Sequence, residues 1–355
     1  MFKSQDLPPD RAQWAAIFRG VIGSPDLYGR QLDGMGGGIS SLSKVCVVGP
    51  STIGNKADVD YTFAAIGVKD DDVDYSSNCG NMSSAIGPFA VDMGLVIPET
   101  ENGECVVTIH NTNTGKIIRS TFPVVDGEAA ASGDFAIAGV AGSGAPVRLD
   151  FVKPGGSKTG KLLPTGQIID LCEDAGVQMT CIDAGNPCVF VAADKLISPF
   201  PADLPPKVIE GDKALMEKLE LIRRHAALKM GLAKEHRDVP GSIPKIAMVW
   251  APRHSSPGLG SGAGDICVRA LSVGQPHKAV PVTVALSLAA AAQLPGSVVH
   301  SCLKDPRART GGIEICHPTG LLKVDAEYDG NGNLESAAVY RTARRLMEGT
   351  IFWKQ

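Results

Sequence analysis

Aromatic residues are scarce in this chain of 355 residues, and neither sign of charge predominates. Phe, Trp and Tyr together make up 5% of the sequence, too few for the stacking platforms that bind single-stranded nucleic acid. Lys and Arg number 34 against 38 Asp and Glu, a formal net charge of −4. This balance does not provide the basic surface that DNA binding needs. We therefore expect no nucleic-acid partner.

Patterns typical of disulfide scaffolds and metal sites are also missing. The nine cysteines include no C-x-x-C pair, and the seven histidines include no H-x-x-x-H pair, so we expect no metal. An odd number of cysteines in so long a chain argues against a disulfide framework. Residues 1–24 carry Asp6, Asp10, Arg11 and Arg19 rather than the apolar stretch of a secretory signal. We predict a cytoplasmic protein with reduced thiols.

One apolar stretch, residues 279–299, is long enough to raise the question of a membrane span. Pro281, Gln293 and Pro295 interrupt it, so a buried helix is the better interpretation. We expect no membrane partner.

The remaining composition is that of a globular protein, with 44% hydrophobic and 20% charged residues. The length predicts two domains. Apolar spacing predicts helices over 7–22, 82–93 with a kink at Pro88, 207–236 and 279–299, and strands over 45–48, 188–191 and 246–251.

Each half of the chain contains one very apolar helix preceded by a polar segment, Asn78-Cys79-Gly80-Asn81 in the first half and residues 275–278 in the second. Helix N-termini favour anions and thiolates, so two of them at one cleft would form an anion site. Cys79 is therefore the best candidate for a functional thiol, with a buried structural cysteine as the equal alternative. The other eight cysteines lie mostly in apolar strand patterns and are interpreted as structural.

Lys44 follows a loop of small residues that includes Ser40, Ser41 and Ser43, and it opens an apolar strand. An exposed lysine with no special role is the ordinary interpretation. Partial burial at this point would instead favour the neutral amine, the form that a general base needs.

Several motifs together resemble the methylaconitate, methylitaconate and oxalomesaconate isomerase family, also called PrpF-like. They span nearly the whole chain in the family's order: Tyr28 to Gly34, Gly36 to Lys44, Ser76 to Met82, Gly160 to Gly166, Asp183 to Pro187, Pro276 to Ala279, His317 to Gly320 and Arg341 to Leu346.

The resemblance implies a diaminopimelate-epimerase-like fold of the α/β (α+β) class. Two pseudo-symmetric domains, residues 1–130 and 131–337, would each wrap a sheet round a central helix, with the active site between them and residues 338–355 returning to the first domain. Family members usually begin with a strand and a Gly-Gly-Thr-Ser-Lys-type loop, so we expect the first domain to lack that strand. His277 stands where the epimerases have a second cysteine, which argues against a two-thiol racemase.

The resemblance also implies a cofactor-independent 1,3-allylic isomerase of an unsaturated di- or tricarboxylate, with Lys44 and Cys79 as catalytic residues. The expected substrate is 4-oxalomesaconate, from the breakdown of aromatic compounds. The alternatives are 2-methylaconitate, methylitaconate, and a non-catalytic tricarboxylate-binding accessory protein. The oligomeric state stays open, with a homodimer as the candidate assembly. Candidate substrate-binding residues are Ser40, Ser43, Asn78, Gly80, Asn81, Asn186, His277, Lys278, His317 and Thr319; for Asn186 and His317 a role in a turn is the equal alternative.

Overall fold

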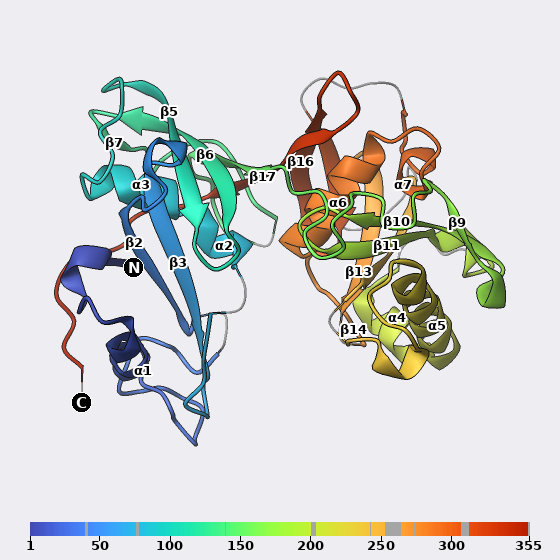
Figure 1. Ribbon diagram of the computed structural model, residues 1–355, viewed down its shortest axis with the longest axis horizontal. Helices are drawn as coiled ribbons and strands as arrows, with labels where there is room; N and C mark the ends of the chain where they lie inside the picture. Colours follow the sequence, from blue (N-terminus) through green and yellow to red (C-terminus); the bar gives the residue numbers. More distant parts are fainter. Residues whose placement is uncertain are drawn as a thin grey trace. The chain divides into compact units, whose positions relative to one another are not determined.

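The computed structural model describes residues 1–39, 42–75, 78–138, 140–199, 204–241, 243–252, 264–272, 274–306 and 312–353. The chain forms two compact units (Figure 1). Unit 1 comprises Met1–Phe135, Ser143–Leu149 and Arg341–Gln355, and unit 2 comprises Ala136–Gly142 and Asp150–Tyr340. Both ends of the chain therefore belong to unit 1.

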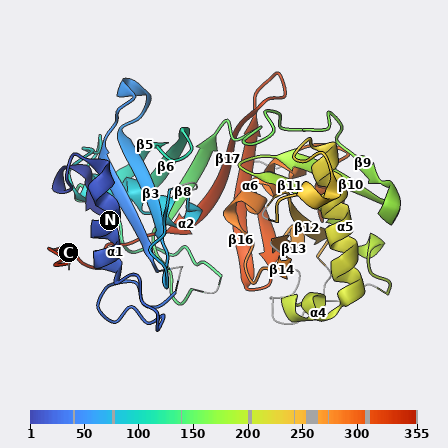
Figure 2. The same cartoon turned by 60° about the horizontal axis from the view of Figure 1, so that its bottom comes forward.

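Unit 1 is a mixed sheet with helices packed on it. Strand β1 pairs in parallel with β2, β2 antiparallel with β3, β3 in parallel with β5, and β5 antiparallel with β6. Helix α3 packs against β5, β6 and β7 (Figure 1). Figure 2 shows the paired strands β3, β5 and β6 side by side. The elements are β1 (Phe2–Lys3), α1 (Trp14–Ile22), β2 (Lys44–Pro50), β3 (Val59–Ile66), β4 (Val73–Asp74), α2 (Gly80–Ser83), α3 (Ile86–Asp92), β5 (Gly103–Asn111), β6 (Lys116–Val125), β7 (Glu128–Ala129) and β8 (Pro146–Val152), of which β8 continues into unit 2.

The first helix ends where the sequence predicts, but it begins at Trp14 rather than at residue 7, after a 3-10 turn over Arg11–Gln13. Trp14, Phe18 and Ile22 lie on one face and are buried, as helical spacing requires. Gly23 ends the helix in the left-handed conformation with φ 83°, which glycine adopts without steric cost.

The apolar helix predicted over residues 82–93 is two helices instead, and this corrects the expected kink at Pro88. Helix α2 ends at Ser83, and α3 begins at Ile86. Pro88 has no N–H for the carbonyl four residues earlier, that of Ser84, and its ring would clash with it. The break therefore falls before the proline, and Pro88 lies in the first turn of α3, where proline is tolerated.

Unit 2 is a larger mixed sheet. The strand order is β9-β10-β11-β12-β13-β15-β16-β17, with β11–β12 and β13–β15 parallel and the other neighbours antiparallel. Helix α6 packs against β10, β11 and β16 (Figure 1). The elements are β9 (Asp170–Cys172), β10 (Val177–Asp183), β11 (Pro187–Ala192), α4 (Pro206–Gly211), α5 (Lys213–Lys229), β12 (Lys245–Trp250), β13 (Ile266–Ser272), β14 (Gln275–Pro276), α6 (Val282–Ala292), α7 (Val298–Ser301), β15 (Ile313–His317), β16 (Gly320–Tyr328) and β17 (Leu334–Thr342).

Two long helices predicted in this half are also divided. The segment 207–236 forms α4 and α5 because the Asp212 carboxylate accepts a hydrogen bond from the Leu215 N–H and caps a new helix. The segment 279–299 forms α6, with Pro281 at its N-cap, and the short α7. Among the described residues, no helix is long and apolar enough to cross a membrane.

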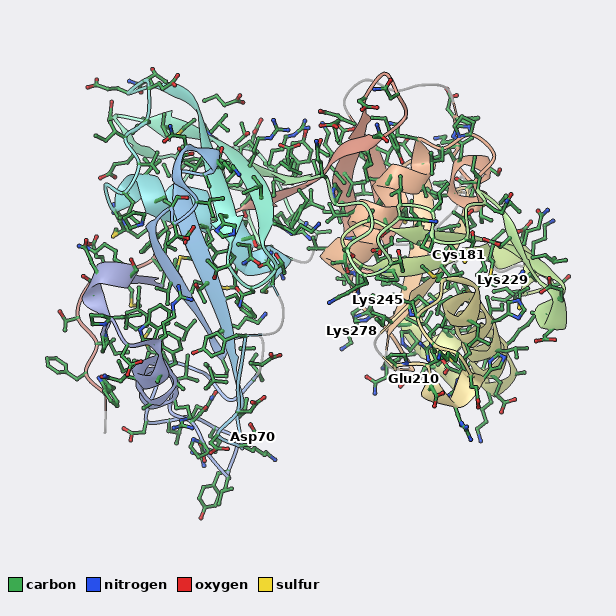
Figure 3. The ribbon with its side chains drawn as sticks, in the orientation of Figure 1. Asp70, Cys181, Glu210, Lys229, Lys245 and Lys278 are labelled. Atoms are coloured by element: carbon green, nitrogen blue, oxygen red, sulfur yellow. The ribbon has the colours of Figure 1, made fainter. Side chains whose placement is uncertain are left out.

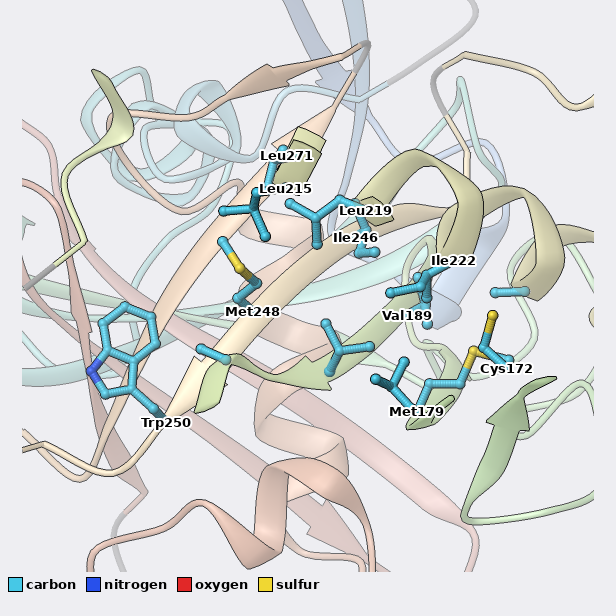
Figure 4. Packing of buried hydrophobic residues seen from close by; sticks show 14 of the residues in the cluster. Cys172, Met179, Val189, Leu215, Leu219, Ile222, Ile246, Met248, Trp250 and Leu271 are labelled. Atoms are coloured by element: carbon cyan, nitrogen blue, oxygen red, sulfur yellow. The ribbon is translucent and has the colours of Figure 1, made fainter. Parts of the chain in front are cut away.

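The hydrophobic cluster between α5 and the sheet of unit 2 confirms the amphipathic face that was predicted for this helix. Leu215, Leu219 and Ile222 are buried in one cluster with Ile246 and Met248 of β12 (Figure 4). Burial of a Leu or Ile side chain stabilises the fold by about 1.5–3 kcal/mol, so this contact fixes α5 on the sheet.

The two units repeat one topology. In unit 1 the order is β1, α1, β2, β3, β4, α2 with α3, β5 and β6; in unit 2 it is β11, α4 with α5, β12, β13, β14, α6, β15 and β16. The pairings correspond as well: the first strand is parallel to the second, the second antiparallel to the third, the third antiparallel to the short fourth, and the third parallel to the strand after the helix. The elements of this series therefore correspond between the units, whereas β9 and β10 of unit 2 precede the series and have no counterpart before β1.

Candidate active site

Lys44 and Cys79 lie in contact in unit 1, with 3.2 Å between Nζ and Sγ. Lys44 is the first residue of β2, and Cys79 is the N-cap residue of α2. Both side chains are half-buried. The structure thus brings together the two residues that the family resemblance implied as catalytic.

Cys79 is held in place by the first turn of α2. The Ser83 N–H and the Ser83 hydroxyl donate to the Cys79 carbonyl, at 2.9 and 3.1 Å. The same hydroxyl lies 3.1 Å from Asn78 Oδ1. Because this oxygen is the acceptor end of the Asn78 amide, the other end of the amide carries the hydrogen-bond donors. With four residues α2 is much shorter than predicted, so the helix dipole expected at Cys79 is small.

A buried layer lies beneath the pair. Cys46 Sγ lies 3.8 Å from the Tyr61 hydroxyl, and both residues are fully buried. Burial raises the pKa of Cys46 to about 12 and also raises the pKa of Tyr61, so both stay protonated at neutral pH. Seven of the nine cysteines are buried, and burial also raises the pKa of half-buried Cys302 to about 11. Cys79, in contrast, is half-buried and in contact with Lys44 Nζ.

Gln31 organises the glycine-rich loop that leads into Lys44. Its carboxamide oxygen accepts from the Gly38 N–H at 2.8 Å and from the Ser43 hydroxyl at 2.9 Å, and its nitrogen donates to Ser24 Oγ at 2.8 Å. The side chain is 2% exposed. Gln31 has φ 51°, which costs a non-glycine residue about 1–3 kcal/mol.

Two glycines of the predicted loop motif allow this arrangement. A Cβ on Gly36 would lie 2.2 Å from the Gln31 carboxamide oxygen, and a Cβ on Gly38 would lie 2.5 Å from the Gly29 carbonyl oxygen. Only glycine lets the loop close round the carboxamide. The two glycines therefore allow the loop conformation that positions Ser43 and Lys44.

Replacing Gln31 by Met is expected to lower kcat about 10-fold or more, since misplacement of a reacting group by about 1 Å can cost about 100-fold. The loss of the carboxamide leaves the Gly38 N–H without its acceptor and leaves the Ser43 hydroxyl with the Ile39 carbonyl alone. Steady-state kinetics, with circular dichroism as a check of the fold, measures the effect. The control is Thr180→Val in unit 2, which removes a fully buried hydroxyl that also has two hydrogen-bond partners. An unchanged kcat in Gln31→Met would show that the loop needs no such support.

The other predicted residues of unit 1 lie in different settings. Ser43 is fully buried, and its hydroxyl lies within donating distance of Gln31 and of the Ile39 carbonyl. Asn81 is exposed, and its Oδ1 lies 3.4 Å from Arg341 Nε. Gly80 is the first residue of α2, so its N–H has no partner within that helix. Ser40 lies outside the described residues.

In unit 2, His277 follows β14, and its N–H donates to the Ala270 carbonyl at 2.8 Å. Burial lowers the pKa of His277, and the nearby positive charge of Lys245 lowers it further, so the ring is neutral at neutral pH. Lys278 is exposed. Helix α6 begins only at Val282, so His277 lies before its first turn rather than at its N-terminus.

The remaining three predicted residues lie in turns or at the end of a strand next to one. Asn186 precedes β11, and its carbonyl accepts from the Ser287 hydroxyl of α6 at 3.2 Å. His317 ends β15 and is 5% exposed; its Nδ1 lies 3.1 Å from the Thr319 hydroxyl in the turn to β16. Both contacts agree with the alternative roles in turns.

Three residues near these candidates were missed by sequence reasoning. Gln31 and Arg341 belong to family-like motifs but were not singled out, and Lys245 belongs to none of the motifs quoted. The signal for Lys245 was its place: like Lys44, it immediately precedes an apolar strand.

Comparisons with known proteins agree with this geometry. The model of the PrpF protein family matches residues 1–354. A 3-methylitaconate isomerase of Eubacterium barkeri is 38% identical over 99% of this chain and 92% of its own length. A (4E)-oxalomesaconate Delta-isomerase of Novosphingobium sp. is 36% identical over 99% of this chain and 93% of its own length.

A crystal structure of methylitaconate-delta-isomerase superimposes with a TM-score of 0.89 and 36% identity, covering 98% of this chain and 90% of that one. This match confirms the diaminopimelate-epimerase-like fold expected from the sequence. The chain therefore belongs to the PrpF family and is an isomerase.

Proposed function

We propose that this chain catalyses a 1,3-allylic proton shift in an unsaturated di- or tricarboxylate without a cofactor. The observation that carries the proposal is the 3.2 Å contact between Lys44 Nζ and Cys79 Sγ. In a chain of the PrpF family this contact supplies a base and an acid at one point.

Lys44, as the neutral amine, removes a proton from the carbon next to the conjugated system. Cys79, in contact with that amine, is placed to return a proton at the far carbon of the allylic unit. The electron pair of the broken C–H bond moves into a dienolate, and reprotonation shifts the double bond. In the alternative, the Lys44 ammonium itself returns the proton, and Cys79 positions the substrate.

The dienolate carries negative charge that hydrogen-bond donors and cations stabilise. Asn78, Gly80 and Asn81 provide donors beside Cys79. Ser43 acts through the loop in this scheme, because its hydroxyl is buried and engaged.

The relatives do not single out one substrate. Those named for methylitaconate, 2-methylaconitate and oxalomesaconate are 38%, 37% and 36% identical. The preference for 4-oxalomesaconate that the sequence suggested therefore has no advantage, and the three acids are equal candidates. Of the three, 4-oxalomesaconate is the acid that would connect this chain to the breakdown of aromatic compounds.

The deciding experiment incubates the protein with each acid separately in deuterium oxide. Ultraviolet absorbance follows movement of the double bond, and mass spectrometry follows deuterium uptake. We expect one acid to isomerise and to carry deuterium. A protein that only binds tricarboxylates would produce neither change, and this result with all three acids would refute the proposal.

A further inference from the structure

Three buried polar side chains form a column between the sheet of unit 1 and the first turn of α2. Cys46 of β2, Tyr61 of β3 and Ser83 of α2 are each fully buried. The Cys46 thiol donates to the Tyr61 hydroxyl, with 3.8 Å between Sγ and the oxygen. The Tyr61 hydroxyl is also hydrogen-bonded to the Ser83 hydroxyl. The column therefore joins the layer beneath the candidate site to the residues that hold Cys79.

Ser83 connects this column to the candidate site. Its hydroxyl lies 3.1 Å from the Cys79 carbonyl oxygen and 3.1 Å from Asn78 Oδ1. Both of these oxygens can only accept, and a serine hydroxyl has a single hydrogen to donate. That hydrogen is used on the side of Asn78 and Cys79. In its bond with Tyr61, the Ser83 oxygen must therefore be the acceptor.

The donors and acceptors consequently leave the column one direction. Tyr61 gives its single hydrogen to Ser83, so its oxygen accepts from the Cys46 thiol, as the geometry of that contact indicates. Both groups keep their hydrogens at neutral pH, because burial raises the pKa of Cys46 to about 12 and also raises the pKa of Tyr61. The hydrogen bonds thus run from Cys46 through Tyr61 and Ser83 to the oxygen of the Asn78 amide.

We infer that Tyr61 is a positioning residue of this isomerase, which fixes the orientation of the Asn78 amide through Ser83. The Ser83 hydroxyl holds the amide oxygen, so the NH₂ end is kept as a donor for a bound anion. The inference deepens the proposed function and rests on it: the anion is the dienolate, which donors fixed in advance stabilise best. Without the Tyr61 hydroxyl, the Ser83 oxygen can accept from the NH₂ group instead. The amide then turns and presents its oxygen to the anion, which repels it.

The test replaces Tyr61 by Phe, which keeps the ring and removes only the hydroxyl. We expect kcat to fall about 10-fold or more, toward the 10²–10³-fold cost of losing one such donor, while KM changes much less. Tyr328→Phe is the matched control, because burial also raises the pKa of Tyr328, and its hydroxyl donates to the Ala290 carbonyl in unit 2 at 3.0 Å. This control should keep the wild-type kcat. An unchanged kcat in Tyr61→Phe, or an equal loss in Tyr328→Phe, would overturn the inference.

A double variant shows whether Tyr61 acts through the amide. Asn78→Ala should lower kcat about 10²-fold. In the Asn78→Ala protein, Tyr61→Phe should cost nothing further, because no amide is left to orient. If Tyr61→Phe lowers kcat by the same factor in both backgrounds, its role is structural only and the inference fails.

The direction of the column has its own test. Cys46→Ala should lower kcat much less than Tyr61→Phe does, because Tyr61 still donates to Ser83. Cys181→Ala removes another fully buried thiol, in unit 2 (Figure 3), and controls for lost packing. A loss in Cys46→Ala as large as in Tyr61→Phe, with Cys181→Ala unaffected, would contradict the assigned direction.

Nuclear magnetic resonance separates this inference from the proposed function, since it needs no turnover. In protein labelled with nitrogen-15 at asparagine, the side-chain amide signals that disappear in Asn78→Ala belong to Asn78. We expect these signals to shift in Tyr61→Phe and to stay in place in Tyr328→Phe. Unmoved signals overturn the inference even if an acid is isomerised. Shifted signals support the positioning of the amide even if none of the three acids is isomerised. Circular dichroism of each variant confirms that it is folded.

Discussion

Lys44→Met is expected to lower kcat by about 10²–10⁴-fold, the usual contribution of a general base. Methionine keeps the length and the apolar stem of the side chain but cannot accept a proton. Because the Cys79 carbonyl accepts hydrogen bonds from the Ser83 N–H and hydroxyl, the backbone at Cys79 should keep its position when Lys44 is replaced. Initial rates with the isomerised acid measure the effect.

Lys44→Arg makes this test sharper. Arginine restores the positive charge but is not deprotonated in proteins, so a base role predicts that it stays as inactive as Met, whereas a purely electrostatic role predicts recovery. Lys116→Met, at an exposed position that opens β6, is the control and should keep wild-type rates. Lys44→Met with full turnover would exclude Lys44 as the base.

Cys79→Ala should separate removal of the proton from its return. If Cys79 is the acid, we expect kcat for isomerisation to fall about 10²-fold or more. Lys44 should still remove a proton from the substrate. The variant should therefore exchange substrate hydrogen with deuterium oxide while the double bond stays in place, which mass spectrometry of the recovered acid detects.

Cys302→Ala is the matched control, because Cys302 is the other half-buried cysteine and lies in unit 2, 3.8 Å from the Val249 carbonyl oxygen. It should keep full activity. Loss of both exchange and isomerisation in Cys79→Ala would contradict a role limited to the second step. Near-normal isomerisation by Cys79→Ser would favour the alternative in which the residue positions the substrate, since a serine hydroxyl is a much weaker acid than a thiol.

Local sequence predicted the elements that local physics controls. The helix over Trp14–Ile22 follows from apolar residues at helical spacing and a glycine stop, and both were readable. The buried face of α5 was equally clear. The breaks within the three other predicted helices could not be read from the apolar spacing, although their causes are local. Pro88 removes a helical hydrogen bond, and the Asp212 side chain caps a new helix, and neither effect changes the apolar periodicity.

The candidate site likewise combines residues that the local sequence indicates with contacts that only the folded chain creates. Lys44 and Cys79 were singled out individually from a strand start and a helix start, and the family resemblance joined them. Their contact depends on the pairing of β2 with β3 and on the position of α2, across a separation of 35 residues. Sequence reasoning did not single out Gln31, because its role depends on the folded loop, which encloses the Gln31 carboxamide.

By itself the sequence determined the composition, the periodic faces of the helices, the glycines of the loop and the identity of the one thiol in an unusual setting. Those are properties of neighbouring residues, which propensity and spacing govern. Only the tertiary structure decided which lysine meets that thiol. The reason is physical: side-chain contacts follow from strand pairing between distant segments, and burial then sets which polar groups stay charged, neutral or unpaired.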